Sequence, residues 1–196
     1  MTQLLILSVI VLVSYGLGSI TGAYYIVKLF TGKDIRKIGS GNVGATNAGR
    51  STGKKGFLLT LVVDAGKVIL ALSFTSLLTD GEAYLILSSF LIMIGHLFPI
   101  QLGFHGGKGV VAYLATALFL CPLSIGVFAI MMGGAYIVIR RYTFSGLLSM
   151  GTIPITAYVI EGSFTISAGL GALFMTVLFF HNRSFHHSVE TKEVRE

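Results

Sequence analysis

Charged residues are scarce in this sequence. Asp, Glu, Lys and Arg together make up 11% of its 196 residues, whereas hydrophobic residues make up 54%. Soluble domains usually carry about 25% charged residues. A chain of this length forms one domain, and the core of a single soluble domain is too small to hide so much apolar surface. The composition therefore predicts one integral membrane domain over residues 1–196, with apolar surface that faces lipid.

Cysteine is nearly absent as well. Cys121 stands alone, so no intrachain disulfide can form, and the residue gives no information on the redox compartment. Its apolar neighbours favour a packing role. No internal repeat is visible, which weighs against the many transporter folds that are built from repeated halves.

The N-terminus lacks the basic residues that begin a secretory signal peptide. Met1-Thr2-Gln3 carries no Lys or Arg, and the uncharged apolar run from Leu4 to Val27 is longer than the hydrophobic part of such a signal. About 20 residues span a bilayer as a helix. The run is therefore predicted to be a retained transmembrane helix.

Five more apolar regions follow, separated mostly by short connectors. They are Phe57–Leu78, Ala83–Phe104, Val110–Ile139, Tyr142–Ile160 and Gly162–Phe180. The one long connector, Thr31–Lys55, is predicted to be a loop rich in glycine and basic residues. The region Val110–Ile139 is unusually long for one helix and too short for two full spans, and Pro122 lies near its middle.

The distribution of positive charge indicates how often this region crosses the membrane. If two short helices meet near Cys121-Pro122, every Lys and Arg except Lys67 lies on one side of the membrane or at its boundary. The connectors on the other side then hold only acidic charge, at Asp80, Glu82 and Glu161. We therefore predict an all-α bundle of seven transmembrane helices, two of them short, with the N-terminus outside and the C-terminus in the cytoplasm.

The segment from Gly39 to Arg50 combines glycines, small polar side chains and one arginine. Glycines let main-chain N–H groups converge on an anion, and Ser, Thr and Asn donate further hydrogen bonds. Arg50 can hold a phosphate with two parallel hydrogen bonds. A basic loop that only contacts anionic lipid heads has the same composition, so both interpretations remain open.

A second candidate segment places Gly106, Gly107 and Gly109 around Lys108, directly before an apolar helix. Helix N-termini favour anions, and the lysine adds a point charge. A Walker A loop requires Ser or Thr after its lysine, and Gly109 stands there, so a nucleotide triphosphatase is not indicated. The alternative is a tight turn whose lysine sets the topology.

Ionisable residues also occur inside the apolar regions. Asp64 and Lys67 are three residues apart on one helix, which predicts an internal ion pair, with a proton relay as the alternative. His96 suits either helix packing or a site. A metal site is not expected, because the spacing of His181 from the later histidines does not align them on one helical face and no zincin motif is present.

Two of these segments together resemble a known family. Ser-Gly-Asn-Val-Gly-Ala-Thr-Asn followed by Arg50, then Gly-His-x-Phe-Pro with Phe-x-Gly-Gly-Lys-Gly-Val, are similar to the first two motifs of the bacterial acyl-phosphate–glycerol-3-phosphate acyltransferases. The resemblance covers most of the chain and implies seven helices in the bacterial inner membrane, with an active site that faces the cytoplasm. It implies acyl transfer from acyl phosphate to the sn-1 hydroxyl of glycerol 3-phosphate. The products are lysophosphatidic acid and phosphate, and the reaction begins phospholipid synthesis.

The resemblance also implies roles for individual residues. The catalytic residues would be Ser40, Arg50, Lys108 and His181, and the substrate-binding residues would be Asn42, Thr46, Asn47, Gly106, Gly107, Gly109, Ser145 and Ser184. His181 begins the third motif, which usually reads His-Arg-x-Asn-Ile with a later glutamate. Here Ser184 stands at the asparagine position, Asn182 is nearby, and Glu190 is the candidate glutamate.

Such a reaction suits these residue types. An acyl phosphate is already activated, so the protein needs mainly to bind two phosphates, align a hydroxyl and stabilise an oxyanion. The implied partners are the two substrates and membrane lipid, without nucleic acid, cofactor or metal. The base is either His181 or an oxygen of a substrate phosphate. The alternative functions are a small transporter or channel for an anionic phosphorylated solute and a catalytically weak paralogue of the acyltransferase.

Overall fold

Helices and their connecting loops make up the whole of the computed structural model, which describes residues 2–193 and, among side chains, those up to residue 182. The helices are α1 (Gln3–Ser19), α2 (Gly22–Thr31), α3 (Ala45–Leu78), α4 (Glu82–Leu97), α5 (Val110–Leu120), α6 (Pro122–Ile139), α7 (Tyr142–Met150), α8 (Thr152–Glu161) and α9 (Phe164–Glu193), with short 3-10 turns η1 (Ile35–Lys37) and η2 (Ile100–Leu102). Residues 2–193 contain no strand, so the predicted all-α class is confirmed.

Six helical segments in the described part of the chain are long and apolar enough to cross a membrane. They are Gln3–Thr31, Ala45–Leu78, Glu82–Leu102, Pro122–Ile139, Tyr142–Glu161 and Phe164–Asn182, and α5 is a shorter apolar helix. The outer surface is apolar too: Ile130 and Val138 on α6 are 77% and 83% exposed. An exposed apolar surface of this kind suits lipid rather than water.

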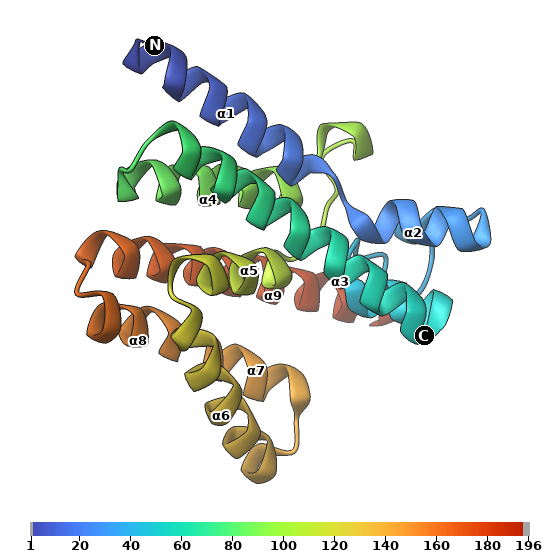
Figure 1. Ribbon diagram of the computed structural model, residues 1–196. Coiled ribbons are helices and arrows are strands. Elements are labelled where there is room, and N and C mark those ends of the chain that lie inside the picture. Colours follow the sequence, from blue (N-terminus) through green and yellow to red (C-terminus); the bar gives the residue numbers. More distant parts are fainter. Residues whose placement is uncertain (1, 194–196) are drawn as a thin grey trace.

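The core lies where α3, α4, α5 and α9 meet. Leu72, Ile92, Tyr113 and Leu173, one from each of these helices, are fully buried in a single cluster. Figure 1 shows α5 and α9 side by side in the middle of the molecule, with α1, α3 and α4 on one side and α6, α7 and α8 on the other. The helices that carry the candidate loops are therefore those that share the core.

Close contact between α1 and α4 depends on glycine. A Cβ atom on Gly18 would lie 2.5 Å from the carbonyl oxygen of Ile92, and one on Gly95 would lie 2.6 Å from that of Tyr15. Small residues of this kind let helix backbones approach closely within a membrane. Ser14 and Ser88 share a buried hydroxyl–hydroxyl hydrogen bond of 2.8 Å in the same interface.

The predicted break near Cys121-Pro122 is confirmed, but only α5 is short, because the 18 residues of α6 are enough for a membrane span. α5 ends at Leu120, Cys121 leaves the helical conformation (φ −150°, ψ 82°), and α6 begins at Pro122. Proline fits this first helical position because it lacks only an N–H that would have no partner inside the helix.

Two further breaks occur where the sequence predicted unbroken helices. The apolar run from Leu4 to Val27 is divided at Ile20-Thr21, between α1 and α2. The run from Tyr142 to Ile160 is divided at Gly151, between α7 and α8. Neither break was predictable from hydropathy, because both runs stay apolar through the division.

The prediction of a loop from Thr31 to Lys55 is wrong for its second half, which is helical. α3 begins at Ala45, so only residues 32–44 connect α2 to α3, and Gly53 (φ 73°) bends the helix after its first two turns. Ala48 on those turns is fully buried with Val27 and Ile35. This burial stabilises a helix in a segment whose glycines disfavour one.

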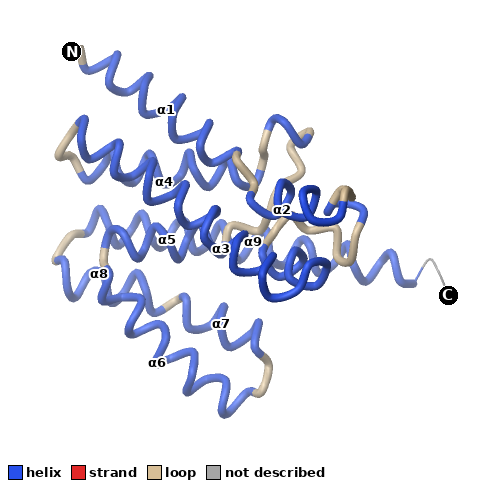
Figure 2. Tube along the Cα trace, turned by 45° about the vertical axis from the view of Figure 1, so that its right-hand side comes forward, coloured by secondary structure: helices blue, strands red, loops and turns tan. Residues whose placement is uncertain are grey.

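The connections between helices lie at the two ends of the molecule. Both views show the α3–α4 and α8–α9 connections at the same end as the N-terminus, and the end of α9 at the opposite end with α2 (Figures 1 and 2). Ser163 donates a hydrogen bond to Glu82, which joins the two connections at the N-terminal end. The loop before α3 and the start of α5 lie toward the end occupied by α2.

Candidate functional site

The first glycine-rich loop is shaped from inside by Asn47. Its side-chain oxygen accepts a hydrogen bond from the backbone N–H of Ser40 (3.2 Å), and its amide nitrogen donates to the carbonyls of Ile38 (2.9 Å) and Asn42 (3.0 Å). The side chain is 1% exposed. Gly39 has a positive φ of 57°, and a Cβ there would overlap the Asn47 oxygen. The loop therefore wraps around this amide.

Three of the predicted polar residues face outward from this loop and from the first turns of α3. Ser40, Thr46 and Arg50 are exposed, in contrast to Asn47. Thr46 and Arg50 border a shallow groove of ≈ 270 Å³, together with Gly49, Gly53, Lys54 and Phe57. A larger apolar groove of ≈ 590 Å³ lies elsewhere, between α6 and the α7–α8 pair.

The second glycine loop terminates α4. The backbone N–H groups of Gly106 and Gly107 donate to the carbonyls of Leu97 and His96 (both 3.1 Å). These two N–H groups are therefore used within the protein, at carbonyls that the helix end leaves without partners. A Cβ on Gly107 would overlap His96 Nε2 and lie 2.8 Å from the carbonyl oxygen of Val43 in the first loop. Gly107 is thus the point at which the two loops touch.

Lys108 lies at the start of α5, directly before its N-cap residue Gly109. Gly109, with a φ of 80°, directly precedes α5, whose first N–H groups have no carbonyl partner within the helix. Burial lowers the pKa of Lys108, and the positive charge of Arg50 lowers it further. Two cations that repel each other beside a helix N-terminus create a place where an anion is strongly favoured.

His181 lies on α9, which packs against the start of α5. A Cβ atom on Gly109 would lie 3.5 Å from the Val177 side chain on α9. His181 lies one helical turn farther along the same face of α9. His181 is half-buried and lies within electrostatic range of Lys108. Its Nδ1 atom is buried and has no hydrogen-bond partner among the described residues. Lys108 therefore lies within electrostatic range of both Arg50 and His181, which come from separate parts of the chain.

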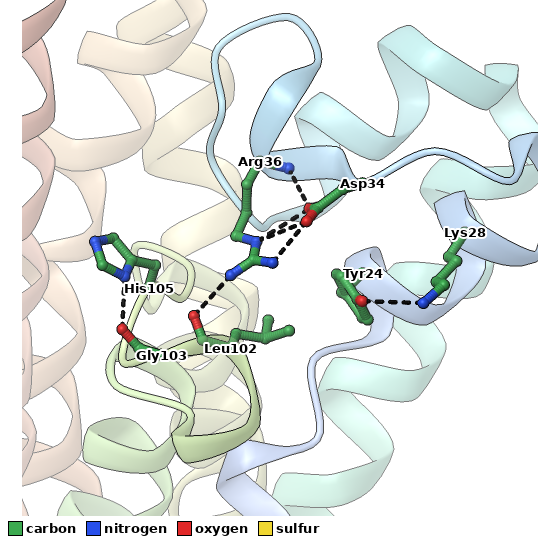
Figure 3. A network of polar contacts seen from close by, with 7 residues as sticks. All are labelled: Tyr24, Lys28, Asp34, Arg36, Leu102, Gly103 and His105. Carbon is green, nitrogen blue, oxygen red and sulfur yellow. Dashed lines mark hydrogen bonds and ion pairs between the residues drawn. The ribbon is translucent and has the colours of Figure 1, made fainter.

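Arg36, which sequence reasoning did not single out, ties the two loops together. Its Nη1 atom donates to the carbonyl of Leu102 (2.8 Å), its Nε and Nη2 atoms hold Asp34, and its guanidinium lies 5.7 Å from the centre of the Tyr24 ring (Figure 3). The bidentate contact of Arg36 lowers the pKa of Asp34 to about 2. No motif could have indicated this role, because the carbonyl that Arg36 contacts is far away in sequence.

The structure leaves two of the predicted residues apart from this cluster. Ser145 on α7 is fully buried, and its hydroxyl has no partner among the described side chains, but no described contact links it to Arg50, Lys108 or His181. Ser184 lies beyond the side chains that the structure describes. Within the described residues, no group of three His, Cys, Asp or Glu side chains is placed to hold a metal ion.

Comparisons with known proteins converge on one family. The sequence model of the glycerol-3-phosphate acyltransferase family matches residues 8–191. Glycerol-3-phosphate acyltransferase 1 of Desulfitobacterium hafniense is 38% identical over 189 residues, with 94% of this chain and 92% of the relative covered. The Agrobacterium fabrum glycerol-3-phosphate acyltransferase is 39% identical, with 79% of this chain and 75% of the relative covered.

Solved structures agree with these relatives. The crystal structure of PlsY (YgiH), an integral membrane glycerol 3-phosphate acyltransferase, in its glycerol 3-phosphate form superposes with a TM-score of 0.81. The two proteins are 26% identical, and the match covers 94% of this chain and 92% of PlsY. The lysophosphatidic acid form has the same fold, with a TM-score of 0.79.

Proposed function

This chain belongs to the glycerol-3-phosphate acyltransferase family, and we propose that it transfers a fatty acyl group from acyl phosphate to the sn-1 hydroxyl of glycerol 3-phosphate. The observation that carries the proposal is the packing of α9 against Gly109 at the start of α5, which places His181 beside Lys108, whose charge also interacts with that of Arg50. Two phosphorylated substrates need such a concentration of positive charge. The glycerol 3-phosphate form of PlsY, which shares the fold, supports the same substrate.

The reaction needs no change of oxidation state. The glycerol hydroxyl attacks the acyl carbon, the new ester bond forms, and the bond between that carbon and the phosphate oxygen breaks. The hydroxyl proton leaves on the phosphate product, either directly or by way of His181. In this scheme Arg50 and Lys108 hold phosphate oxygens, and the first N–H groups of α5 add donors.

Polar residues of the first loop and of the first turn of α3 complete the proposed site. Ser40 and Thr46 are exposed and Asn42 is half-buried, and they carry hydroxyl or amide groups. The loop lies toward the same end of the molecule as the start of α5 (Figure 1). We assign Asn47 a loop-shaping role within the site, because its amide is fully engaged with the loop backbone. Gly106 and Gly107 likewise act through the shape of their loop, since their N–H groups bond to α4.

We further propose seven crossings of the bacterial inner membrane, with α5 as the short seventh, the N-terminus outside and the site facing the cytoplasm. Six long apolar segments and one short apolar helix support this number. The start of α1 and the described end of α9 lie at opposite ends of the molecule, which supports an odd number of crossings (Figures 1 and 2). The basic loops at the end occupied by α2 support a cytoplasmic position.

The direct test uses purified protein with acyl phosphate and labelled glycerol 3-phosphate, and it measures labelled lysophosphatidic acid. We expect product from acyl phosphate and none from acyl-CoA, because the polar surface consists of short loops without a motif for the larger donor. Equal rates with acyl-CoA would contradict the donor assignment. Flux of a phosphorylated solute through proteoliposomes without a new ester would favour the transporter alternative.

Variants of the third motif test the assignment of individual residues. His181→Ala should lower kcat by about 100-fold or more, the usual contribution of a general acid or base. Ser184→Asn restores the usual asparagine of the family and should leave turnover unchanged or raise it. Wild-type protein that makes no product, together with an active Ser184→Asn variant, would identify the chain as a decayed paralogue.

A further inference from the structure

A cluster of ionisable side chains lies between α3 and α4 in the membrane-spanning part of the molecule, next to the second glycine loop. It consists of Asp64 and Lys67 on α3 and His96 on α4, and their exposed fractions are 1%, 3% and 3%. Lys67 Nζ lies 3.2 Å from Asp64 Oδ1 and 3.0 Å from His96 Nδ1. Buried charges are costly and are often replaceable by apolar residues without loss of stability, so packing alone does not account for the cluster.

The ion pair holds the break between α1 and α2 open. Lys67 donates to the carbonyls of Gly18 (2.9 Å) and Ile20 (2.6 Å), and Asp64 accepts a hydrogen bond from the backbone N–H of Gly22 (3.1 Å). These carbonyl and N–H groups lose their helical partners where α1 ends and α2 begins. The two charges therefore satisfy both sides of the break.

The contact with Lys67 also fixes the orientation of the His96 ring. An ammonium group donates hydrogen bonds and has no lone pair, so Nδ1 of His96 must be the acceptor. In the neutral imidazole the proton then resides on Nε2. Hydrogen-bonding chemistry thus assigns both the tautomer and the direction in which the ring points.

The same ring supports the second glycine loop. His96 Nε2 occupies the space that a side chain on Gly107 would need, and the His96 carbonyl accepts the hydrogen bond from the Gly107 N–H at 3.1 Å. Gly107 also touches the carbonyl of Val43 in the first loop. A rotation of the ring would therefore move the point at which the two loops meet, next to Lys108.

We propose that Asp64, Lys67 and His96 form a positioning network that sets the shape of the second glycine loop and thereby the affinity of the site for the phosphate of glycerol 3-phosphate. The proposal rests on the acyltransferase function. Lys67 and Asp64 do not touch substrate; they act through the His96 ring, and the ring acts through Gly107. The same side chains thus stabilise the α1–α2 break and orient the loop.

The test is a double-mutant cycle on purified protein. Lys67→Met removes the ammonium at similar length, and His96→Ala removes the ring. Each should raise KM for glycerol 3-phosphate by about 10-fold, the effect of losing one oriented contact, and leave kcat within about threefold. The double variant should be no worse than the poorer single variant, because Lys67 acts through His96.

Ser88→Ala is the matched control. It removes the buried hydrogen bond with Ser14 in the same α1–α4 interface and has no contact with the glycine loop. It should lower the unfolding temperature without raising KM. If the His96→Ala effect matches that of Ser88→Ala, or if the Lys67 and His96 effects multiply in the double variant, the network has only a structural role and the proposal is wrong.

A second readout separates this proposal from the acyltransferase function. The rise in unfolding temperature produced by glycerol 3-phosphate reports binding without any acyl donor. His96→Ala should reduce this rise, whereas Ser88→Ala should keep it. If Lys67→Met does not fold, the uncharged pair Asp64→Asn/Lys67→Met replaces it in the cycle. Wild-type protein that binds glycerol 3-phosphate but makes no product would contradict the function and leave the binding test of the network intact.

Discussion

Gly107 is the residue on which the two loops of the site depend most directly. A methyl group there would meet the His96 ring on one side and the Val43 carbonyl, at 2.8 Å, on the other. We predict that Gly107→Ala raises KM for glycerol 3-phosphate by between about 10- and 100-fold, because displacement of a positioning loop by about 1 Å has effects of this size. Steady-state kinetics on purified protein will measure it.

A second glycine supplies the control for this variant. Gly133 lies within α6, and a Cβ atom there would have no neighbour within 4 Å. Gly133→Ala should therefore leave the kinetics unchanged, and both variants should insert into the membrane like the wild type. Unchanged KM in Gly107→Ala would mean that the second glycine loop is only a turn.

The lowered pKa of Lys108 predicts that activity falls at alkaline pH. Burial and the charge of Arg50 lower its pKa, so its positive charge is lost at a pH below about 10.4, where an ordinary lysine titrates. The protonated form binds phosphate. The value of kcat/KM for glycerol 3-phosphate should therefore fall as pH rises through this lowered pKa, since kcat/KM reports groups of the free enzyme.

The variant Lys108→Arg identifies the group responsible for this limit. A guanidinium stays protonated across the same range, so the alkaline fall in kcat/KM should disappear even if the overall rate is lower. An identical alkaline fall in Lys108→Arg would assign the limit to a different group.

Sequence patterns identified charged pairs better than they identified amides. The spacing of Asp64 and Lys67 predicted an ion pair, which the structure confirms at 3.2 Å. The contact of Lys67 with His96 depends on the packing of α3 against α4 and has no local pattern. Asn47 was grouped with the substrate-binding residues, because an amide in a glycine-rich loop suits a phosphate and a backbone carbonyl equally well. Only the folded loop reveals which groups its amide contacts.

At the level of whole elements, the sequence predicted the break that contains a proline and missed two breaks without one. Pro122 and the length of its apolar run indicated the division between α5 and α6. The break at Ile20-Thr21 is stabilised by Lys67, which is distant in sequence. The break at Gly151 has Pro154 only inside the following helix. Hydropathy detects the length of a span, whereas breaks of this kind depend on tertiary contacts.

The connection between the two loops predicts a role for Arg36. Arg36→Ala removes the hydrogen bond from Nη1 to the Leu102 carbonyl and leaves the first loop less restrained. We expect KM for glycerol 3-phosphate to rise by about 3- to 10-fold, somewhat less than the usual contribution of a hydrogen bond to a charged group, because the guanidinium is partly exposed. Initial-rate measurements at varied glycerol 3-phosphate will test this.

Asp34→Asn is the control for Arg36→Ala, because Asp34 is the ion-pair partner of Arg36. Exposed ion pairs contribute little to stability, so Asp34→Asn, which keeps Arg36 in place beside Leu102, should change KM by less than about twofold. The pKa of Asp34 is lowered to about 2, so the ion pair is present at neutral pH and is lost only as pH falls toward that value. Equal effects of the two variants would show that the ion pair, not the contact with Leu102, restrains the loop.

Across the whole molecule, charge is divided between the two ends of the bundle. Acidic residues Asp80, Glu82 and Glu161 lie at the end that carries the N-terminus, and the basic loops lie at the other. Because positive charge is retained in the cytoplasm, the acidic end should face outside. The short helix α5 decides the outcome, since counting it as a crossing places the basic loop before α3 and the basic residues Arg140 and Arg141 on the same side as the basic C-terminal segment.

Cysteine labelling in intact cells tests this arrangement, in a Cys121→Ala background that removes the native thiol. Glu161→Cys should react with a membrane-impermeant thiol reagent added outside. Arg141→Cys should be protected until the membrane is permeabilised, because the α6–α7 connection is reached from outside only by crossing α6. Labelling of Lys192→Cys from outside would mean an even number of crossings. In that case α5 would enter and leave the membrane on one side, and the site built around Lys108 would not share a compartment with the third motif.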